Sequence, residues 1–154
     1  MNTDVEIRRL TDIDALVRWR MEVLRCVFAD ADSPDWDALE EAGREYYSRH
    51  NPPDDNVTVI ASVNGIDAGC GALCMQEEMP SPDNPSGRCA YLMSIYVRDA
   101  FRRRGIGGAI VNRLINEARN RLAGKIYLET SSMGEPLYLH TGFEPMEGML
   151  KLKH

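Results

Sequence analysis

The sequence predicts an α/β fold in which helices cover both faces of a mixed sheet. Three observations support this prediction. The apolar run 92–97 precedes a glycine-rich turn and an amphipathic stretch, 109–122, which is the pattern of a strand, a turn and a helix. A further strand is expected over 125–130, and a strand–helix–strand unit of this kind makes a right-handed crossover between parallel strands. Asn64-Gly65 between two apolar runs predicts an antiparallel hairpin.

The other elements follow from local patterns. Residues 5–10 alternate apolar and charged side chains, as a half-buried first strand does. Thr11 and Asp14 form an N-cap signal for the helix that follows. The predicted elements outside the crossover are then helices over 13–28 and 35–49, strands over 57–63, 66–75 and 89–97, a short helix over 133–141, and a final hairpin made of 143–145 and 149–153.

Composition limits the class of protein. A chain of 154 residues, 44% hydrophobic and 27% charged, fits one globular domain over 1–154. It contains no apolar run of the roughly 20 residues that span a bilayer, and its first residues do not form a signal peptide. The formal net charge of −6 disfavours general nucleic-acid binding. We therefore expect a cytoplasmic protein that binds neither membranes nor nucleic acids. Its cysteines show no CxxC spacing and are expected to be reduced and mostly buried, as is usual in the cytosol.

The glycine-rich turn is Arg102-Arg103-Arg104-Gly105-Ile106-Gly107-Gly108. The first N–H groups of a helix lack partners and carry partial positive charge, and glycines let an anion approach them closely. A P-loop is excluded because no lysine follows the glycines, and a dinucleotide fingerprint fails because Ile110 replaces its third glycine. The turn thus predicts a phosphate or pyrophosphate site. The alternative is a structural turn beside a solvated arginine patch.

Two motifs at the expected separation resemble one family. Arg102-x-x-Gly105-x-Gly107 is similar to the Gln/Arg-x-x-Gly-x-Gly/Ala signature of the GNAT superfamily of N-acetyltransferases. Residues 137–143 resemble the Leu-Tyr-x-x-x-Gly-Phe segment that closes GNAT domains, and residues 91–97 resemble the family's fourth strand. The order of elements fits that family over nearly the whole chain. The resemblance implies a single domain with a mixed, mostly antiparallel sheet of about seven strands and about four helices.

The resemblance also implies acetyl-CoA as cosubstrate. The main chain of Ile95, Tyr96 and Val97 would bind the pantetheine arm as an added strand does. The glycine-rich turn would hold the pyrophosphate through its amides and charges, with these residues taking part: Arg102, Arg103, Arg104, Gly105, Ile106, Gly107 and Gly108.

Tyr138 matches the family tyrosine that protonates the departing thiolate. A phenol pKa near 10, against about 8.5 for a thiol, keeps it able to donate a proton at neutral pH. The alternative is a tyrosine that only packs. The general base stays open, because Tyr91 stands where family members often carry glutamate, and Glu129 or a water relay are the candidates. Ser131 and Gly134 also depart from the family pattern on the acceptor side. No metal is expected, since the histidines form no constellation with carboxylates.

The predicted reaction is direct attack of an amine on acetyl-CoA in a ternary complex. A small-molecule amine is the first candidate acceptor, a protein N-terminus or lysine the second, and a homodimer is compatible with the resemblance. Trp36, Tyr46 and Tyr47 with Asp35 and Asp37 either line a pocket for a cation or only pack. The proline-containing loop 79–87 is either a flap beside the substrate or a disordered connector.

Two other functions remain open at this level. A non-catalytic acyl-CoA-binding module is favoured by the missing glutamate at position 91 and opposed by Tyr138. An anion- or nucleic-acid-binding domain would use Arg102, Arg103 and Arg104, and would bind polynucleotide in a strongly salt-dependent way.

Overall fold

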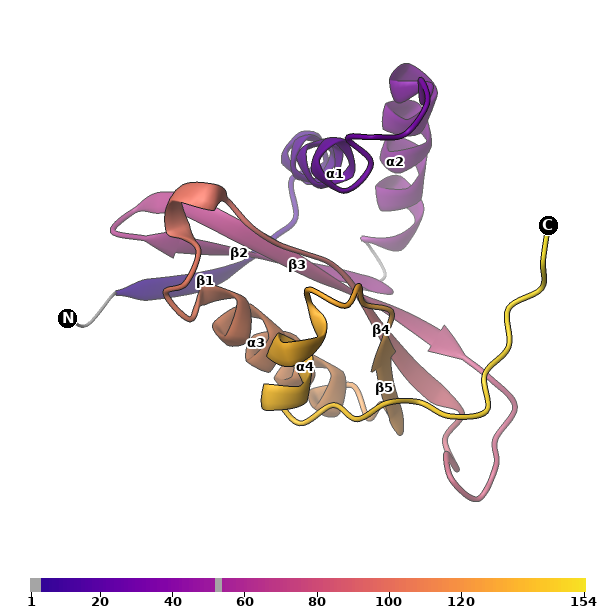
Figure 1. The fold of residues 1–154 in the computed structure, drawn as a ribbon. Coiled ribbons are helices and arrows are strands. Elements are labelled where there is room, and N and C mark those ends of the chain that lie inside the picture. The colour runs from indigo at the N-terminus through magenta and orange to yellow at the C-terminus, as the bar shows by residue number, and fades with distance from the viewer. Residues whose placement is uncertain (1–3, 52–53) are drawn as a thin grey trace.

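The computed structural model describes residues 4–51 and 54–154 and contains one five-stranded sheet (Figure 1). The order of its strands in space is their order in the chain, β1-β2-β3-β4-β5. Each neighbouring pair from β1 to β4 is antiparallel. β5 pairs parallel to β4, as the crossover predicted. The strands are β1 (Val5–Leu10), β2 (Asn56–Val63), β3 (Ile66–Glu77), β4 (Arg88–Val97) and β5 (Lys125–Leu128).

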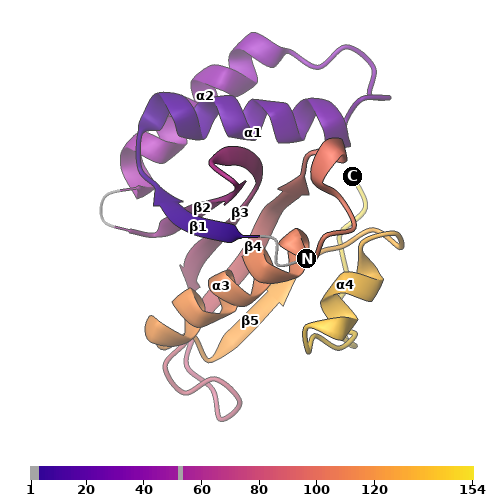
Figure 2. The same cartoon turned by 90° about the vertical axis from the view of Figure 1, so that its left-hand side faces the viewer.

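Helices cover both faces of this sheet (Figures 1 and 2). One face carries α1 (Ile13–Val27) and α2 (Trp36–His50), and the other carries α3 (Ile106–Asn120) with α4 (Glu135–His140) beside it. A turn of 3-10 helix, η1 (Asp99–Phe101), follows β4. The predicted α/β architecture is confirmed.

Side-chain packing explains how α1 and α3 are placed. Asp12 caps α1 by accepting from the Ala15 amide at 2.9 Å, and the apolar side chains that follow at helical spacing are buried. On the opposite face, α3 buries Ile110 and Leu114 against β3. A Cβ at Gly71 would clash with Ile110, so the small residues of β3 let α3 approach the sheet backbone closely.

The predicted seven-strand count was wrong, because no final hairpin forms among the described residues. Residues 143–154 contain no strand, and Leu150 and Leu152 are 99% and 86% exposed. The apolar and basic alternation of this tail suits a strand, but a strand also needs a partner edge, and a lone hairpin is marginal in water. Here β5 is only four residues long, and Pro145 has no N–H to donate to a ladder.

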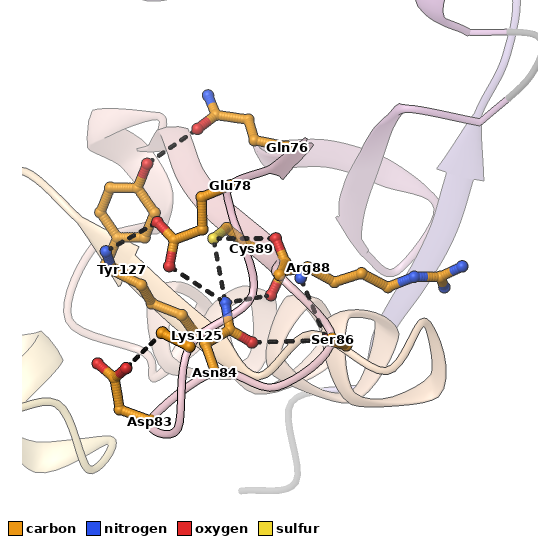
Figure 3. Close-up of polar contacts among 11 residues, drawn as sticks. Gln76, Glu78, Asp83, Asn84, Ser86, Arg88, Cys89, Lys125 and Tyr127 are labelled. Atoms are coloured by element: carbon orange, nitrogen blue, oxygen red, sulfur yellow. Dashed lines mark hydrogen bonds and ion pairs between the residues drawn. The ribbon is translucent and has the colours of Figure 1, made fainter.

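The loop 79–87 is neither a disordered connector nor a flap. Asn84 is only 1% exposed, and its side-chain amide donates to Glu78 Oε1 at 3.3 Å and to the Arg88 carbonyl at 3.2 Å (Figure 3). Lys125 of β5 reaches the other oxygen of Glu78 at 3.4 Å. These contacts fix the loop to the end of β4 that lies away from the glycine-rich turn.

None of the described helices is long and apolar enough to cross a membrane.

Candidate functional site

A bulge in β4 separates the two cavities of the site. Between the pairs Cys70↔Tyr96 and Ala72↔Met93, one residue of β3 lies opposite two of β4, Ser94 and Ile95. Ser94 takes a left-handed conformation with φ 61°, which costs energy for a residue with a Cβ. The extra residue interrupts the alternation of the strand: Met93 and Ser94 both line a cavity on the α1 and α2 side, and Ile95 lines one beside α3 and α4.

The second of these cavities, here named the glycine-loop groove, has a volume of about 610 Å³. It runs between the second half of β4, the turn before α3, and α4, and its lining includes Cys26 and Val27 at the end of α1. Every predicted site residue except Arg104 lines it: Ile95, Tyr96, Val97, Arg102, Arg103, Gly105, Ile106, Gly107, Gly108 and Tyr138. The groove thus brings together residues more than forty positions apart in the sequence.

One wall of the groove is a free sheet edge. β5 pairs with β4 only from Cys89 to Leu92, so in the described chain the same edge of β4 has no ladder partner beyond that point. The Arg98 amide donates to the Ala68 carbonyl on β3 at 2.8 Å, and strand alternation therefore directs the main-chain groups of Ile95 and Val97 into the groove. Tyr96 directs its own main-chain groups toward β3.

The turn before α3 presents a row of amides. Arg103 and Gly105 both have positive φ, at 63° and 77°, and alternate with residues of ordinary conformation, which is how a backbone forms an anion-binding concavity. Within residues 4–51 and 54–154, the amides of Arg103, Arg104 and Gly105 have no backbone acceptor. The first-turn amides of α3 lack intrahelical partners as well. At Gly107 a Cβ would lie 3.2 Å from Leu137, so glycine also allows α4 to pack closely.

The three arginines take different positions. The Arg102 side chain donates from Nε to the Val97 carbonyl at 3.0 Å and pairs with Asp99 at 2.9 Å, so it fixes the turn to β4. Arg103 lines the groove and is exposed. The Arg104 guanidinium lies over the Phe101 ring at 5.6 Å and is not part of the groove lining.

Tyr138 comes from α4 and faces the free edge of β4 across the groove. Its ring packs edge-on against Phe143, with 6.0 Å between ring centroids, and partial burial raises the pKa of its hydroxyl above the usual 10. The phenol therefore stays protonated at neutral pH. α4 and the Gly142 turn together place this hydroxyl, because Phe143 returns to pack on the same ring.

The cavity on the other face of β4, here named the α1–α2 pocket, has a volume of about 480 Å³. β3 and β4 form its floor, and α1 and α2 form its roof. Its walls are apolar side chains together with several hydroxyl, thiol and amide groups and one arginine: Arg20, Leu24, Leu39, Ala42, Gly43, Tyr46, Tyr47, Asn56, Ala72, Cys74, Gln76, Tyr91, Met93 and Ser94.

The polar groups of this pocket are partly satisfied by one another. The Tyr46 hydroxyl lies 3.2 Å from Cys74 Sγ, and the Asn56 amide lies 3.5 Å from the same hydroxyl. Burial, with Cys74 as its neighbour, raises the pKa of Tyr46 well above its usual range, and burial raises the pKa of Tyr47 to about 12. None of these hydroxyls is ionised at neutral pH.

Tyr91 and Glu129 lie together at the β5 side of this face. Tyr91 pairs with Tyr127 across the parallel ladder, with ring centroids 5.0 Å apart. Burial and the neighbouring Glu129 carboxylate raise the pKa of Tyr91. Glu129, one residue beyond the end of β5, is exposed to solvent.

The predicted aromatic and acidic cluster at α2 is only partly present. Tyr46 and Tyr47 line the α1–α2 pocket, but Trp36, Asp35 and Asp37 do not. Asp35 instead caps α2 by accepting from the Ala38 amide at 3.0 Å. A pocket that binds a cation through Asp35 and Asp37 is therefore a wrong prediction.

Sequence reasoning missed two features of the pocket. Arg20 was a detectable signal, because it lies four residues from both Leu16 and Leu24 and so puts a charge on the apolar face of α1. The Ser94 bulge has no comparable sequence signal.

In the part of the chain that the structure describes, no three His, Cys, Asp or Glu side chains gather where they could hold a metal ion.

Comparison with known proteins places this fold and groove in a family. The model of the acetyltransferase (GNAT) family matches residues 13–143. A predicted acetyltransferase from Clostridium acetobutylicum, solved with acetyl-CoA, is 25% identical with a TM-score of 0.85, and the match covers 97% of this chain and 96% of that one. A GCN5-related N-acetyltransferase from Ralstonia eutropha is 26% identical with a TM-score of 0.81, covering 97% and 99%.

A more distant structure shares the fold alone. An aminoglycoside N-acetyltransferase in complex with the bisubstrate analogue CoA-S-monomethyl-acetylneamine is 16% identical, with a TM-score of 0.75 and coverage of 99% of both chains. No curated protein sequence gives a significant match. Because the family model covers most of the chain and includes both the glycine-rich turn and Tyr138, the chain belongs to the acetyltransferase (GNAT) family.

Proposed function

We propose that this protein transfers the acetyl group of acetyl-CoA to the amine of a small acceptor by direct attack in a ternary complex. The observation that carries the proposal is the meeting of two cavities at the β4 bulge. The glycine-loop groove and the α1–α2 pocket lie on opposite faces and border the adjacent residues Ile95 and Ser94. A thioester in one cavity and an amine in the other would meet at that point.

The groove suits acetyl-CoA in three places. The amides of the turn 103–108 would hold the pyrophosphate, with the exposed charge of Arg103 beside them. The main-chain carbonyl of Ile95 would accept from a pantetheine amide as in an added strand. Val97 would contribute its N–H, because the Arg102 side chain already occupies its carbonyl. Arg102 therefore acts on the cofactor indirectly, by holding the turn.

The chemistry needs one acid and one base. The amine nitrogen forms a bond to the acetyl carbonyl carbon, the C–S bond breaks, and the amine loses a proton while the thiolate gains one. Tyr138 would give its phenol proton to the departing sulfur, which its raised pKa permits at neutral pH. The main-chain N–H of Ile95 would stabilise the oxyanion that forms on the way.

Glu129 is the proposed base. It lies next to Tyr91, on the face of the sheet where the acceptor would sit, and it is exposed enough to pass the proton on to water. Tyr91 itself holds its proton at neutral pH because its pKa is raised.

A homodimer stays a prediction, which light scattering of the purified protein checks directly.

Thermal unfolding with acetyl-CoA tests the cofactor. Ligand at a hundred times its dissociation constant should stabilise the fold by about 2.7 kcal/mol, a shift of several degrees for a domain of this size. ATP and NAD serve as controls, and neither should shift the transition as strongly. Equal shifts with all three ligands would reduce the groove to a general anion site.

Thiol release across a panel of amines tests the reaction. Amine-dependent release of CoA supports the enzyme, whereas tight acetyl-CoA binding without any release would favour a non-catalytic acyl-CoA-binding module. Polynucleotide binding that weakens steeply with salt would instead favour an anion-binding role for the arginines of the turn.

A further inference from the structure

The lining of the α1–α2 pocket has an unequal balance of charge. Among the described residues that line it, Arg20 is the one with a full charge, and no aspartate or glutamate is present. The Tyr46 and Tyr47 hydroxyls add no negative charge, because both keep their protons at neutral pH. The lining itself thus carries one positive charge, although the whole chain carries a net charge of −6, and the nearby Glu129 carboxylate lies at the β5 side of the pocket, next to Tyr91.

The Arg20 guanidinium has little to bind within the described chain. Its one polar contact is a long hydrogen bond from Nη1 to Ser94 Oγ, at 3.3 Å. The acid two residues along α1, Glu22, is committed to Arg98 through two bonds of 2.9 Å. Arg20 is only half-exposed and shares the roof of the pocket with Tyr47. A half-buried guanidinium with free donors offers a planar, two-pronged site for an oxyanion.

Arg20 lies close to the point where the two cavities meet, so an oxyanion bound to it would lie close to the reacting amine. Through Ser94, Arg20 touches the bulge, and the next residue, Ile95, borders the groove. Apolar side chains, among them Leu24, Leu39 and Met93, form much of the rest of the lining. An occupant that fits has an anionic group close to the reacting amine and an apolar body beyond it, and a volume of about 480 Å³ holds one of modest size.

We infer that the acceptor is an apolar α-amino acid or a close analogue, with its carboxylate bound by Arg20 and its side chain in the α1–α2 pocket. This inference rests on the proposed function, because it names the acceptor of the same site. It also predicts that polycationic amines bind less tightly than amino acids, since the Arg20 guanidinium in the lining repels a second cation.

Matched ligand pairs test the inference through binding, without any need for turnover. Phenylalanine is compared with phenethylamine, and leucine with 3-methylbutylamine, because each pair differs only by the carboxylate. Phenylalaninamide keeps the size of the amino acid without its charge. Affinities are measured by calorimetry on the protein alone and on the protein saturated with CoA.

Two variants locate the preference. Arg20→Gln removes the charge in the pocket, while Arg18→Gln removes the same charge from an exposed position of the same helix. The wild type should bind at least one amino acid about tenfold or more tightly than its decarboxylated partner. Arg20→Gln should abolish that ratio, and Arg18→Gln should keep it. CoA affinity should be the same in all three proteins.

The inference is overturned if amino acids and amines bind equally, if no amino acid binds, or if Arg20→Gln keeps the preference. Failure of the proposed function shows itself differently. In that case CoA does not bind, or CoA binds and no acetyl group moves, whatever the calorimetry of the amino acids gives.

Discussion

The glycine-loop groove and the α1–α2 pocket share β4 as a wall but present different groups to a ligand. The groove offers main-chain N–H groups from the turn before α3 and from the free edge of β4. The pocket offers side chains from α1, α2, β2, β3 and β4. Main-chain recognition depends on backbone conformation, which restricts residue type and so leaves a short motif in the sequence. Side-chain recognition leaves only scattered residues, which the fold has to bring together.

Tyr138 is the proposed acid on the groove side, so its loss should separate chemistry from binding. Tyr138→Phe should lower kcat about 10²- to 10⁴-fold while acetyl-CoA affinity stays unchanged, because the ring still packs on Phe143. Steady-state thiol release and calorimetry check the two parts. Since burial raises the pKa of Tyr138, ionisation of this acid should not reduce the wild-type rate below about pH 10.

The control for Tyr138→Phe is Tyr127→Phe. The Tyr127 hydroxyl donates to Gln76 at 2.9 Å and does not line the groove (Figure 3). A similar rate loss in both variants would contradict an acid role for Tyr138.

If the groove binds acetyl-CoA through its main chain, a substitution that disturbs the backbone conformation should weaken that binding without removing any charge. Gly105→Val should weaken acetyl-CoA binding about 100-fold, because a side chain at φ 77° disturbs the turn whose amides hold the anion. Gly65→Val is the matched control, since Gly65 has φ 79° and equally open surroundings in the β2–β3 hairpin. Both variants should lose similar stability. Equal CoA affinity in both would show that the turn does not bind through its amides.

Ser94 forms the boundary between the two cavities. Ser94→Val should destabilise the protein by about 1–2 kcal/mol, because a β-branched residue resists the left-handed conformation that the bulge needs. Ser94→Gly should leave the melting temperature nearly unchanged, since glycine adopts this conformation readily. Thermal unfolding of the two variants checks the difference. Similar stabilities would mean that the bulge imposes no such demand.

The smallest effect concerns the attachment of α1, which carries Arg20. Glu22 joins α1 to Arg98 at the end of β4, and the Arg98 guanidinium also lies 4.2 Å from the centroid of the Trp19 ring. Glu22→Gln should cost about 1 kcal/mol at neutral pH, because the pair is partly exposed to solvent. It should raise KM for the acceptor, because α1, which carries Arg20, loses part of its support, and steady-state kinetics check this value.

The pH dependence of this pair has a defined sign. The bond from Arg98 lowers the pKa of Glu22 below its ordinary value of 4.5, so the unfolded chain takes up this proton more readily than the folded one. The contribution is therefore present above about pH 4.5 and is lost as the pH falls through the lower folded-state pKa. Denaturant titrations between pH 3 and 7 should show a shallower acid loss for Glu22→Gln than for the wild type.

Local patterns predicted much of the fold and the groove side of the site. Helical spacing gave α1, α2 and α3, and Asn64-Gly65 gave the β2–β3 hairpin. The crossover rule gave the parallel pairing of β4 and β5. The predicted final hairpin does not form. The alternation of its residues favours a strand but supplies no partner for it, and the available edge of β5 is short.

The sequence by itself determined the order of elements and the conformation of the glycine-rich turn, because periodicity and residues such as Gly105 act within a few positions of the chain. Only the tertiary structure decided that Ser94 forms a bulge and that Arg20 faces a pocket. These features depend on contacts between α1, β3 and β4, which are far apart in the sequence. Ser94 and Arg20 have these roles because of the elements packed against them, and the residues next to them in the sequence do not indicate which elements those are.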